Sequence, residues 1–364
     1  MAASPASKGP DTRTLVERVL DDVGGAFTVG LAYVGQKLGL VAALAARGPV
    51  TSAALAAGAG LDERYVREWL NGMVAASYIE HDPAAGTYWM TDEQRAALVD
   101  EGARTYVAGT FGLAVPSLAM APRLIDMFRE GGGIPFAELS PEIPEAIDRM
   151  HRPWFDHMLV QEWLPVAPGL VAALAHGVSV LDVGCGRGRS TLALARAFPQ
   201  STVVGIDPHP PSIEAARDAA SAAGLRNARF ATCAVEEVAR TQEDGEVPPC
   251  QFDVILAIDC VHDMVDPVGG LRAMSELLSP GGAVFWVEPT GSRNPLENRN
   301  PAGKMRATLS PFHCLTVSLA AGGAGLGTII GEEGARELAQ AARFGSFTKL
   351  PYENPMQQLF LLRR

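Results

Sequence analysis

The chain has 364 residues, enough for two domains, and 48% of them are hydrophobic while 20% are charged, an ordinary balance for a protein with a folded core. The net charge of −11 argues against broad phosphate-driven binding to nucleic acid, and it argues equally against docking on an anionic membrane surface. We therefore expect neither a nucleic acid nor a membrane as partner.

The cysteines and the N-terminal residues indicate a reducing compartment. The five cysteines include no CxxC pair and are odd in number, which favours buried thiols over a disulfide framework. They are Cys185, Cys233, Cys250, Cys260 and Cys314. Residues 1–12 lack the apolar segment of a signal peptide and are predicted to be a disordered tail. Since no run of 18 apolar residues occurs either, we expect a soluble, cytoplasmic protein.

Residues 13–96 have the pattern of a winged-helix domain. Apolar residues recur with helical spacing from Phe27 to Leu44. Thr51 and Asp62 can then cap two further helices, and alternating residues around a turn at 78–90 predict a hairpin. A helix, two more helices and a β-wing in this order are typical of that module.

A winged helix often suggests a DNA reader, but the composition of its second capped helix does not support that role. The segment Asp62-Glu63-Arg64-Tyr65-Val66-Arg67-Glu68 holds three acids against two arginines, so phosphates would repel it at least as much as they attract it. We favour a domain that forms a homodimer and covers an active site. A winged-helix DNA-binding regulator remains the less favoured alternative.

The rest of the chain divides into a helical linker and an α/β domain. Residues 97–170 are mostly helical but are interrupted by glycines and prolines, as in the lids and walls of substrate sites. The interruptions are Gly131-Gly132-Gly133, Pro141, Pro144 and Pro153. Over residues 171–364 strands alternate with helices, which predicts a Rossmann-like, doubly wound α/β sheet.

The first strand of this domain leads into a glycine-rich turn. Residues 178–183 form an apolar strand that runs into Gly184-Cys185-Gly186-Arg187-Gly188, followed by a helix at 190–198. The spacing is G-x-G-x-G, whereas a dinucleotide-binding loop has G-x-G-x-x-G. Asp207 ends the next strand, where a carboxylate can accept both ribose hydroxyls of an adenosine. This order predicts an adenosine-containing cofactor.

These segments resemble the class I S-adenosylmethionine-dependent methyltransferases. Residues 181–188 are similar to their motif I, and Gly205-Ile206-Asp207-Pro208 is similar to their motif II. Later segments resemble their remaining strands and complete a seven-stranded sheet: 252–257, 283–288, 347–350 and 358–362. With its winged-helix front end, the chain resembles the subgroup that acts on small molecules and is usually dimeric.

The resemblance implies a set of residues that bind S-adenosylmethionine. They are Asp182, Gly184, Cys185, Gly186, Gly188, Asp207, Pro208, Cys233, Ala234 and Asp259. The family often has an acid after its third strand for the adenine amino group, but here none occurs from Phe230 until Glu236. The backbone at Cys233 and Ala234 is therefore expected to serve instead.

The exit of the fourth strand carries the candidate catalytic residues, Asp259-Cys260-Val261-His262-Asp263. Two interpretations remain open. His262 could be a general base that removes a hydroxyl proton during O-methylation. Alternatively, His262 and Asp263 could both ligate a metal.

A third candidate ligand, His313, favours the metal. In the α-keto acid C-methyltransferases of peptide-antibiotic pathways, including those that act on phenylpyruvate, an adjacent His-Asp pair and a later His bind one metal. The resemblance of His262, Asp263 and His313 to that pattern implies an Fe or Zn site. A zinc cluster of Cys260, His262, His313 and Cys314 is also conceivable, although nothing in the spacing enforces tetrahedral geometry.

We therefore predict methyl transfer to C3 of a small α-keto acid in natural-product biosynthesis, because a Lewis acid stabilises the enolate that this chemistry needs. The alternative is metal-free O-methylation of a small natural product with His262 as base.

The predicted substrate-binding residues lie mostly in the lid. Arg149 or Arg152 could pair with a keto-acid carboxylate, and Trp154 and Phe155 could shape an apolar pocket. Glu288, at the end of the fifth strand, could orient His262 or bind substrate.

Overall fold

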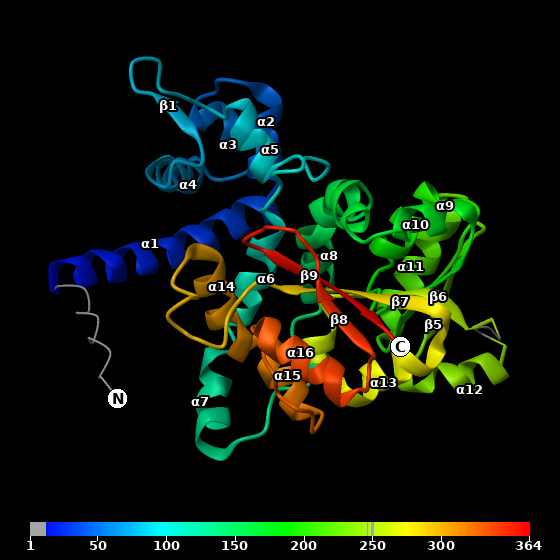
Figure 1. The fold of residues 1–364 in the computed structure, drawn as a ribbon. Coiled ribbons are helices and arrows are strands. Elements are labelled where there is room, and N and C mark those ends of the chain that lie inside the picture. Colours follow the sequence, from blue (N-terminus) through cyan, green and yellow to red (C-terminus); the bar gives the residue numbers. More distant parts are fainter. Residues whose placement is uncertain (1–11, 246, 249–250) are drawn as a thin grey trace. The chain divides into compact units, whose positions relative to one another are not determined.

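The structure is a computed structural model that describes residues 12–245, 247–248 and 251–364 (Figure 1). Of the predicted tail at residues 1–12, only Thr12 belongs to the described residues. Cys250 also lies outside them. The chain forms two compact units, with the division between Val115 and Pro116.

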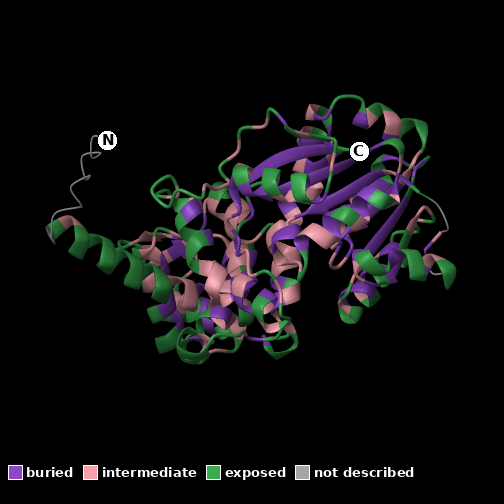
Figure 2. Cartoon of the chain, turned by 60° about the horizontal axis from the view of Figure 1, so that its bottom comes forward, coloured by how far each residue is buried: buried purple, intermediate pink, exposed green. Residues whose placement is uncertain are grey.

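The first unit opens with two helices, α1 (Thr12–Lys37) and α2 (Leu40–Arg47). The stripe from Phe27 to Leu44 had predicted one continuous helix. The chain turns instead at Gly39, whose φ of 69° lies in the left-handed region that glycine tolerates. Much of α1 is exposed (Figure 2), including large apolar side chains such as Leu20 (66% exposed) and Phe27 (77%).

The capped helices and the wing follow as the sequence predicts. The amide of Ala54 donates to the Thr51 hydroxyl at 3.2 Å at the start of α3 (Ser52–Ala59). The amide of Tyr65 donates to Asp62 at 3.2 Å at the start of α4 (Glu63–Ala75). Strands β1 (Glu80–Asp82) and β2 (Thr87–Trp89) then pair antiparallel, before helix α5 (Asp92–Leu98). This arrangement confirms the predicted winged helix.

Helices occupy the segment before the sheet. They are α6 (Gly109–Leu118), α7 (Ala121–Glu130), η1 (Phe136–Glu138), α8 (Ile143–Pro153), η2 (Trp154–Trp163), η3 (Leu164–Val166) and α9 (Leu170–His176). The glycine interruption is present, with φ of 78° at Gly131 and 80° at Gly132. Pro153, by contrast, ends α8 without leaving the helical path, because η2 continues directly as a π-helix.

The second unit is built on a seven-stranded sheet in the order β5-β4-β3-β6-β7-β9-β8. All neighbours are parallel except β9, which runs antiparallel to β7 and β8. The strands are β3 (Ser179–Val183), β4 (Thr202–Asp207), β5 (Ala228–Thr232), β6 (Phe252–Ile258), β7 (Leu278–Pro289), β8 (Ser346–Lys349) and β9 (Gln357–Arg363). The predicted α/β class and the seven-stranded sheet are confirmed.

Helices cover both faces of this sheet, as its buried central strands require (Figure 2). One face packs on α13 (Pro267–Leu277) and α16 (Gly331–Ala341), the other on α9 and α10 (Arg189–Ala197). The remaining elements are α11 (Pro210–Ala222), η4 (Val235–Glu237), α12 (Val238–Glu243), η5 (Val261–Asp263), α14 (Pro301–Leu309), η6 (Ser310–Phe312) and α15 (Cys314–Ala320). Among the described residues, no single helix is long and apolar enough to cross a membrane, although three bent helix pairs together reach that length and composition.

Candidate active site

The turn after β3 needs its three glycines. Gly184, Gly186 and Gly188 have φ of 67°, 54° and 82°, all in the left-handed region. A Cβ atom on Gly184 would lie 2.7 Å from the Cβ of Cys260, and one on Gly188 would lie 2.7 Å from the Cβ of Ala216. A Cβ on Gly186 would meet nothing within 4 Å. The turn is thus tightly packed at both ends and open in the middle, where a ligand can approach the backbone.

Asp207 joins this turn to the end of β4. Its Oδ2 accepts from the amide of Gly186 at 2.9 Å, and its Oδ1 accepts from the amide of His209 at 2.9 Å. Burial raises the pKa of Asp207, and the two amide donors oppose that rise. Each carboxylate oxygen keeps a further lone pair, so the carboxylate can accept from a ribose while it braces the turn.

Asp182 lies beneath the turn and binds the next helix. Its Oδ2 accepts from the hydroxyls of Ser190 and Thr191 at 2.5 and 2.6 Å. Burial raises the pKa of Asp182 to about 6. These contacts link β3 to α10; direct binding of the cofactor by Asp182 stays a prediction.

The remaining predicted cofactor residues surround the ends of β4 and β5. Cys185 and Cys233 are buried, and Pro208 is exposed. The Ala234 amide donates to Oε2 of Glu237 at 3.1 Å. Sequence reasoning missed this glutamate, which already occupies one of the two backbone groups that we expected to serve the adenine.

His262 and Glu288 form a buried pair at the ends of β6 and β7. The Nδ1 of His262 donates to Oε2 of Glu288 at 2.7 Å, and the indole of Trp286 donates to the other carboxylate oxygen at 2.9 Å. His262 is 2% exposed and Glu288 is fully buried. Burial alone would disfavour the imidazolium, but the carboxylates of Asp263 and Glu288 outweigh it and raise the pKa of His262 well above its usual value. Glu288 therefore contacts His262, and its role in orienting the ring stays a prediction.

The other ring nitrogen of His262 faces a second group of side chains. Its Nε2 lies 3.4 Å from Oδ1 of Asp263, and Cys314 completes a set whose ligand atoms lie within 4.8 Å of one another. Among the described residues, the other such set is Asp259, His262 and Glu288. The structure thus brings His262 and Asp263 together with Cys314, which was expected to be a buried thiol and, as a ligand, was considered only for the conceivable zinc cluster.

His313 lies close to this group without joining it. The side chain is buried, its Nδ1 has no hydrogen-bond partner among the described residues, and its ring packs edge-on to Phe136. Burial lowers the pKa of His313. Its predicted role as third metal ligand stays a prediction.

The predicted substrate residues lie around a histidine that sequence reasoning did not select. Arg152 pairs with Asp156 at 3.1 Å, and Arg149 also has an interaction partner. The rings of Trp154 and Phe155 both pack against His151, at centroid distances of 4.0 and 6.2 Å. The helical spacing of Asp148 and His151, three residues apart, was the signal that could have identified this second face of α8.

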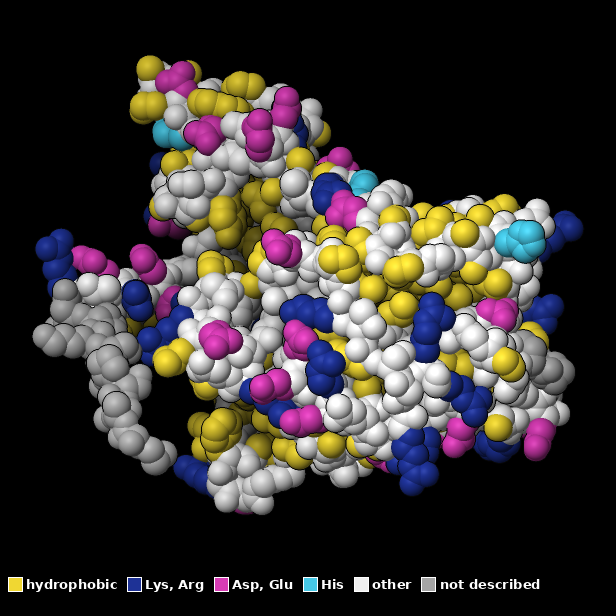
Figure 3. All heavy atoms as spheres, in the orientation of Figure 1, with side chains coloured by type: hydrophobic (Ala, Val, Ile, Leu, Met, Phe, Trp, Pro, Cys, Tyr) yellow, Lys and Arg dark blue, Asp and Glu magenta, His cyan; other side chains and the backbone are white. Residues whose placement is uncertain are grey.

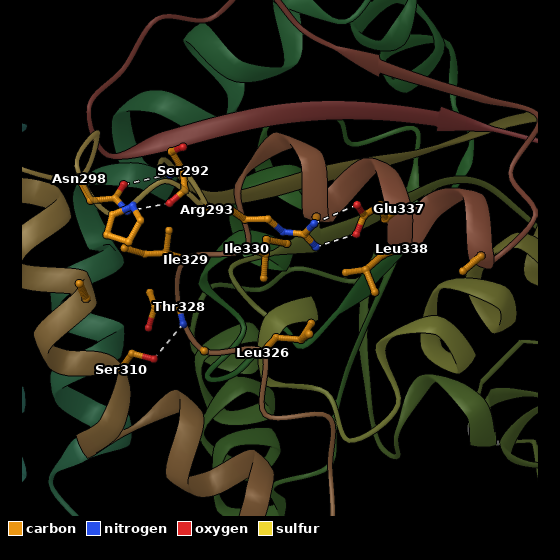
Figure 4. Close-up of a pocket in the computed structure, with 15 residues that line it drawn as sticks. Ser292, Arg293, Asn298, Ser310, Leu326, Thr328, Ile329, Ile330, Glu337 and Leu338 are labelled. Carbon is orange, nitrogen blue, oxygen red and sulfur yellow. Dashed lines mark hydrogen bonds and ion pairs between the residues drawn. The ribbon is translucent and has the colours of Figure 1, made fainter. Parts of the chain in front are cut away.

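A cavity of about 650 Å³ opens between α14, the loop at 326–330 and α16 (Figure 4). Its rim carries an ion pair in which Arg293 contacts Glu337 at 2.7 and 2.9 Å. On the opposite side, the amide of Thr328 donates to the Ser310 hydroxyl at 3.1 Å. None of the described residues that line it is a predicted site residue. Thr328, one of the lining residues, also acts on the Cys314 thiol, where it opposes the rise in pKa that burial causes.

Comparison with known families identifies both units. A model described as "Methyltransferase domain" matches residues 174–319, and a model described as "Rv2258c-like winged HTH domain" matches residues 25–100. The chain contains a class I methyltransferase domain. It follows an N-terminal winged helix-turn-helix domain, as the sequence predicted.

One curated relative extends this likeness. The ubiquinone biosynthesis O-methyltransferase of Paracidovorax citrulli (strain AAC00-1) is 32% identical over 150 residues, which are 40% of this chain and 60% of that relative. The chain thus spans less than two thirds of that relative's length.

Two solved structures share the fold along nearly the whole chain. The mitomycin 7-O-methyltransferase MmcR is 20% identical, with a TM-score of 0.69 over 98% of this chain and 100% of that one. Human N-acetylserotonin methyltransferase, solved in complex with SAM (S-adenosylmethionine), is 16% identical, with a TM-score of 0.71 over 99% of both chains. At these identities the likeness establishes the fold.

Proposed function

We propose that the protein is an S-adenosylmethionine-dependent O-methyltransferase of a small hydroxylated natural product, with His262 as general base. The observation that carries this proposal is the buried His262–Glu288 pair, at 2.7 Å, at the exits of β6 and β7. The names of two relatives support it, since both the Paracidovorax protein and MmcR are O-methyltransferases. This was our alternative prediction, and it now replaces C-methylation of an α-keto acid as the main one.

The glycine turn and Asp207 fit the methyl donor. The open backbone at Gly186 would lie against the cofactor, and the Asp207 carboxylate would accept from its ribose. When bound, S-adenosylmethionine supplies an electrophilic methyl group. The sulfonium chemistry needs no further activation by the protein, so the remaining task is to deprotonate the acceptor.

His262 is placed for that task. Because Glu288 accepts from Nδ1, the second ring nitrogen, Nε2, is the atom that takes the proton of the acceptor hydroxyl. Glu288 then stabilises the imidazolium that forms, and the Trp286 indole keeps the carboxylate in place. The carboxylates that raise the pKa of His262 make its neutral ring a stronger proton acceptor, and that neutral form is reached towards alkaline pH.

A chelation experiment separates this proposal from the metal-assisted alternative. Purified protein is incubated with S-adenosylmethionine and two acceptor panels, one of phenols and one of α-keto acids, with and without EDTA. We expect O-methylated phenols whose yield EDTA leaves unchanged, measured by mass spectrometry and NMR. A C3-methylated keto acid that disappears with EDTA and returns with Fe²⁺ or Zn²⁺ would overturn the proposal.

The second candidate function is metal-assisted C-methylation, and one observation favours it. A histidine, a carboxylate and a thiol within 4.8 Å of one another are donors that suit Zn or Fe. Such a metal would supply Lewis acidity for an enolate. Elemental analysis of wild type, Cys314→Ala and His313→Ala distinguishes the two possible sets of metal ligands. If His313→Ala lost the metal and Cys314→Ala kept it, the ligands would be those that the sequence predicted.

We propose that the N-terminal domain forms a homodimer and does not bind DNA. Both arginines of α4 are paired within the helix, Arg64 with Glu68 and Arg67 with Glu63 at 2.8 Å. On the face shown in Figure 3, the charged side chains of the N-terminal domain are mainly acidic. The phosphate-binding capacity of such a surface is small.

The exposed apolar residues of α1 supply the dimer contact. We expect light scattering to give twice the chain mass for wild type, and about the chain mass when Leu20 and Phe27 are both changed to glutamate, because buried apolar area drives association. Phe128→Glu alters an equally exposed side chain on α7 and is the control. A monomeric wild type at micromolar concentration would contradict this proposal.

A further inference from the structure

Two residues of helix α8, Asp148 and His151, lie one helical turn apart. Both contact residues that follow the carboxyl ends of central strands, where the cofactor would bind. Asp148 accepts from both Nε and Nη2 of Arg189, with the Nε contact at 3.0 Å, and this is the fork geometry of a strong ion pair. His151 has its Nε2 3.1 Å from Oδ2 of Asp259. All four side chains are at most 26% exposed, so solvent screens these two contacts far less than it screens surface pairs.

The partners of these residues belong to the two segments that enclose the cofactor site. Arg189 is the first residue of α10 and follows Gly188 of the glycine turn. Asp259 follows the last residue of β6, three positions before His262. Helix α8 is therefore attached to two segments. One is the glycine turn that would hold the methyl donor, and the other is the exit of β6, which leads to the proposed base His262.

Asp259 occupies a backbone conformation that needs support. Its φ of 55° is left-handed, which for a residue other than glycine costs about 1–3 kcal/mol. This bend places Cys260 against Gly184, and the Cys260 thiol 3.3 Å from the carbonyl of Val183. His151 therefore contacts the side chain of Asp259, the residue whose backbone makes the bend.

The surroundings of His151 hold its ring in one orientation. The imidazole is stacked on Trp154 at 4.0 Å with an interplanar angle of 19°. Burial disfavours the charged form of Asp259, yet the nearby His151, His262 and Arg306 outweigh it, and its pKa falls to about 2. The Asp259 carboxylate is thus kept in its charged form, and Nε2 of the stacked His151 ring lies 3.1 Å from one of its oxygens.

We propose that Asp148 and His151 are positioning residues, which hold α8 across the cofactor site and thereby set how slowly the bound cofactor leaves. The inference rests on the proposed function, because it assumes that S-adenosylmethionine occupies this site. His151 additionally keeps Asp259 in the bend that leads to His262.

The test compares S-adenosylhomocysteine binding to full-length variants by calorimetry and stopped-flow displacement. Asp148→Asn and His151→Leu are expected to weaken binding about tenfold, mainly through faster dissociation, because each leaves a buried charged partner unpaired. The exchanged pair Asp148→Arg with Arg189→Asp should recover most of the loss. His151→Gln should stay within about threefold of wild type, because its amide nitrogen can take the place of Nε2.

A matched control is Glu138→Gln, which removes the exposed ion pair between Arg123 and Glu138, a contact that involves no residue of α8, and should leave the affinity unchanged. Hydrogen exchange of residues 143–153 in the cofactor-free protein provides a second measurement, and faster exchange is expected in Asp148→Asn and His151→Leu. Wild-type affinity and dissociation rate in both variants would overturn the inference. If wild type does not bind S-adenosylhomocysteine, the proposed function fails. In that case, unchanged hydrogen exchange of α8 in Asp148→Asn and His151→Leu overturns this inference as well. Faster exchange in these variants supports the attachment of α8.

Discussion

Replacing Asp207 by alanine is expected to weaken S-adenosylhomocysteine binding about 100-fold or more, because the substitution removes the carboxylate that we propose as the ribose acceptor and also leaves two amides without their acceptor. The Gly186 amide is the more important of the two, since it belongs to the open middle of the glycine turn. Calorimetric titration measures the loss directly and needs no knowledge of the methyl acceptor.

The control for this experiment is Asp218→Asn, which alters an exposed acid on α11 and should bind like wild type. Asp207→Asn separates the contribution of the ribose contact from that of the backbone amides. Its side-chain amide keeps one acceptor oxygen, which can serve the turn or the ribose but not both. Wild-type affinity in a folded Asp207→Ala protein would show that the cofactor does not use this strand end. Circular dichroism establishes that the variant is folded.

The position of Asp207 beside the glycine turn could be predicted, because the elements that place it follow one another directly in the sequence. A parallel strand, a tight glycine turn, a helix and a second strand fix the end of β4 beside the turn, whatever the rest of the chain does. The same holds for the caps at Thr51 and Asp62, where the side chain bonds a backbone amide three residues on. Short-range chemistry of this kind survives any tertiary arrangement.

The breaks in the helices were less predictable. Gly39 lies inside a regular apolar stripe, and a glycine in that position is compatible with either a continuous helix or a left-handed turn. Pro153 was expected to interrupt the lid, but the π-helix that begins at Trp154 accommodates it. In both cases packing decides between two local conformations of similar energy.

The composition of the candidate catalytic group around His262 depends on contacts between distant segments. His262 and Glu288 lie at the exits of neighbouring parallel strands, so their proximity could be inferred from the sheet order. The neighbours Cys314 and His313 both lie far along the chain, and only the orientation of η6 and α15 places the thiol within reach of His262. His151 was missed for the same reason, since its partner Asp259 is on another element.

The second large effect is expected at His262. His262→Asn should lower the rate of methyl transfer to a phenol that wild type accepts by about 10²–10⁴-fold, because it removes the ring nitrogen that we propose as the proton acceptor. Asparagine can still donate to Glu288, so the buried carboxylate keeps a partner and the fold is preserved. S-Adenosylhomocysteine affinity should therefore stay within about twofold of wild type.

The dependence of stability on pH tests the same side chain without an acceptor. The pKa of His262 is higher in the folded chain than in the unfolded one, because Asp263 and Glu288 favour its charged form. Its stabilising contribution is therefore complete below the unfolded pKa and is lost as pH rises through the folded value. Urea unfolding of wild type should show this loss on the alkaline side, and His262→Asn should lack that part of it. If the variant retained both the methylation rate and the alkaline loss, His262 would be neither the base nor the charged partner of Glu288, and the group around Cys314 would be the next place to look for the base.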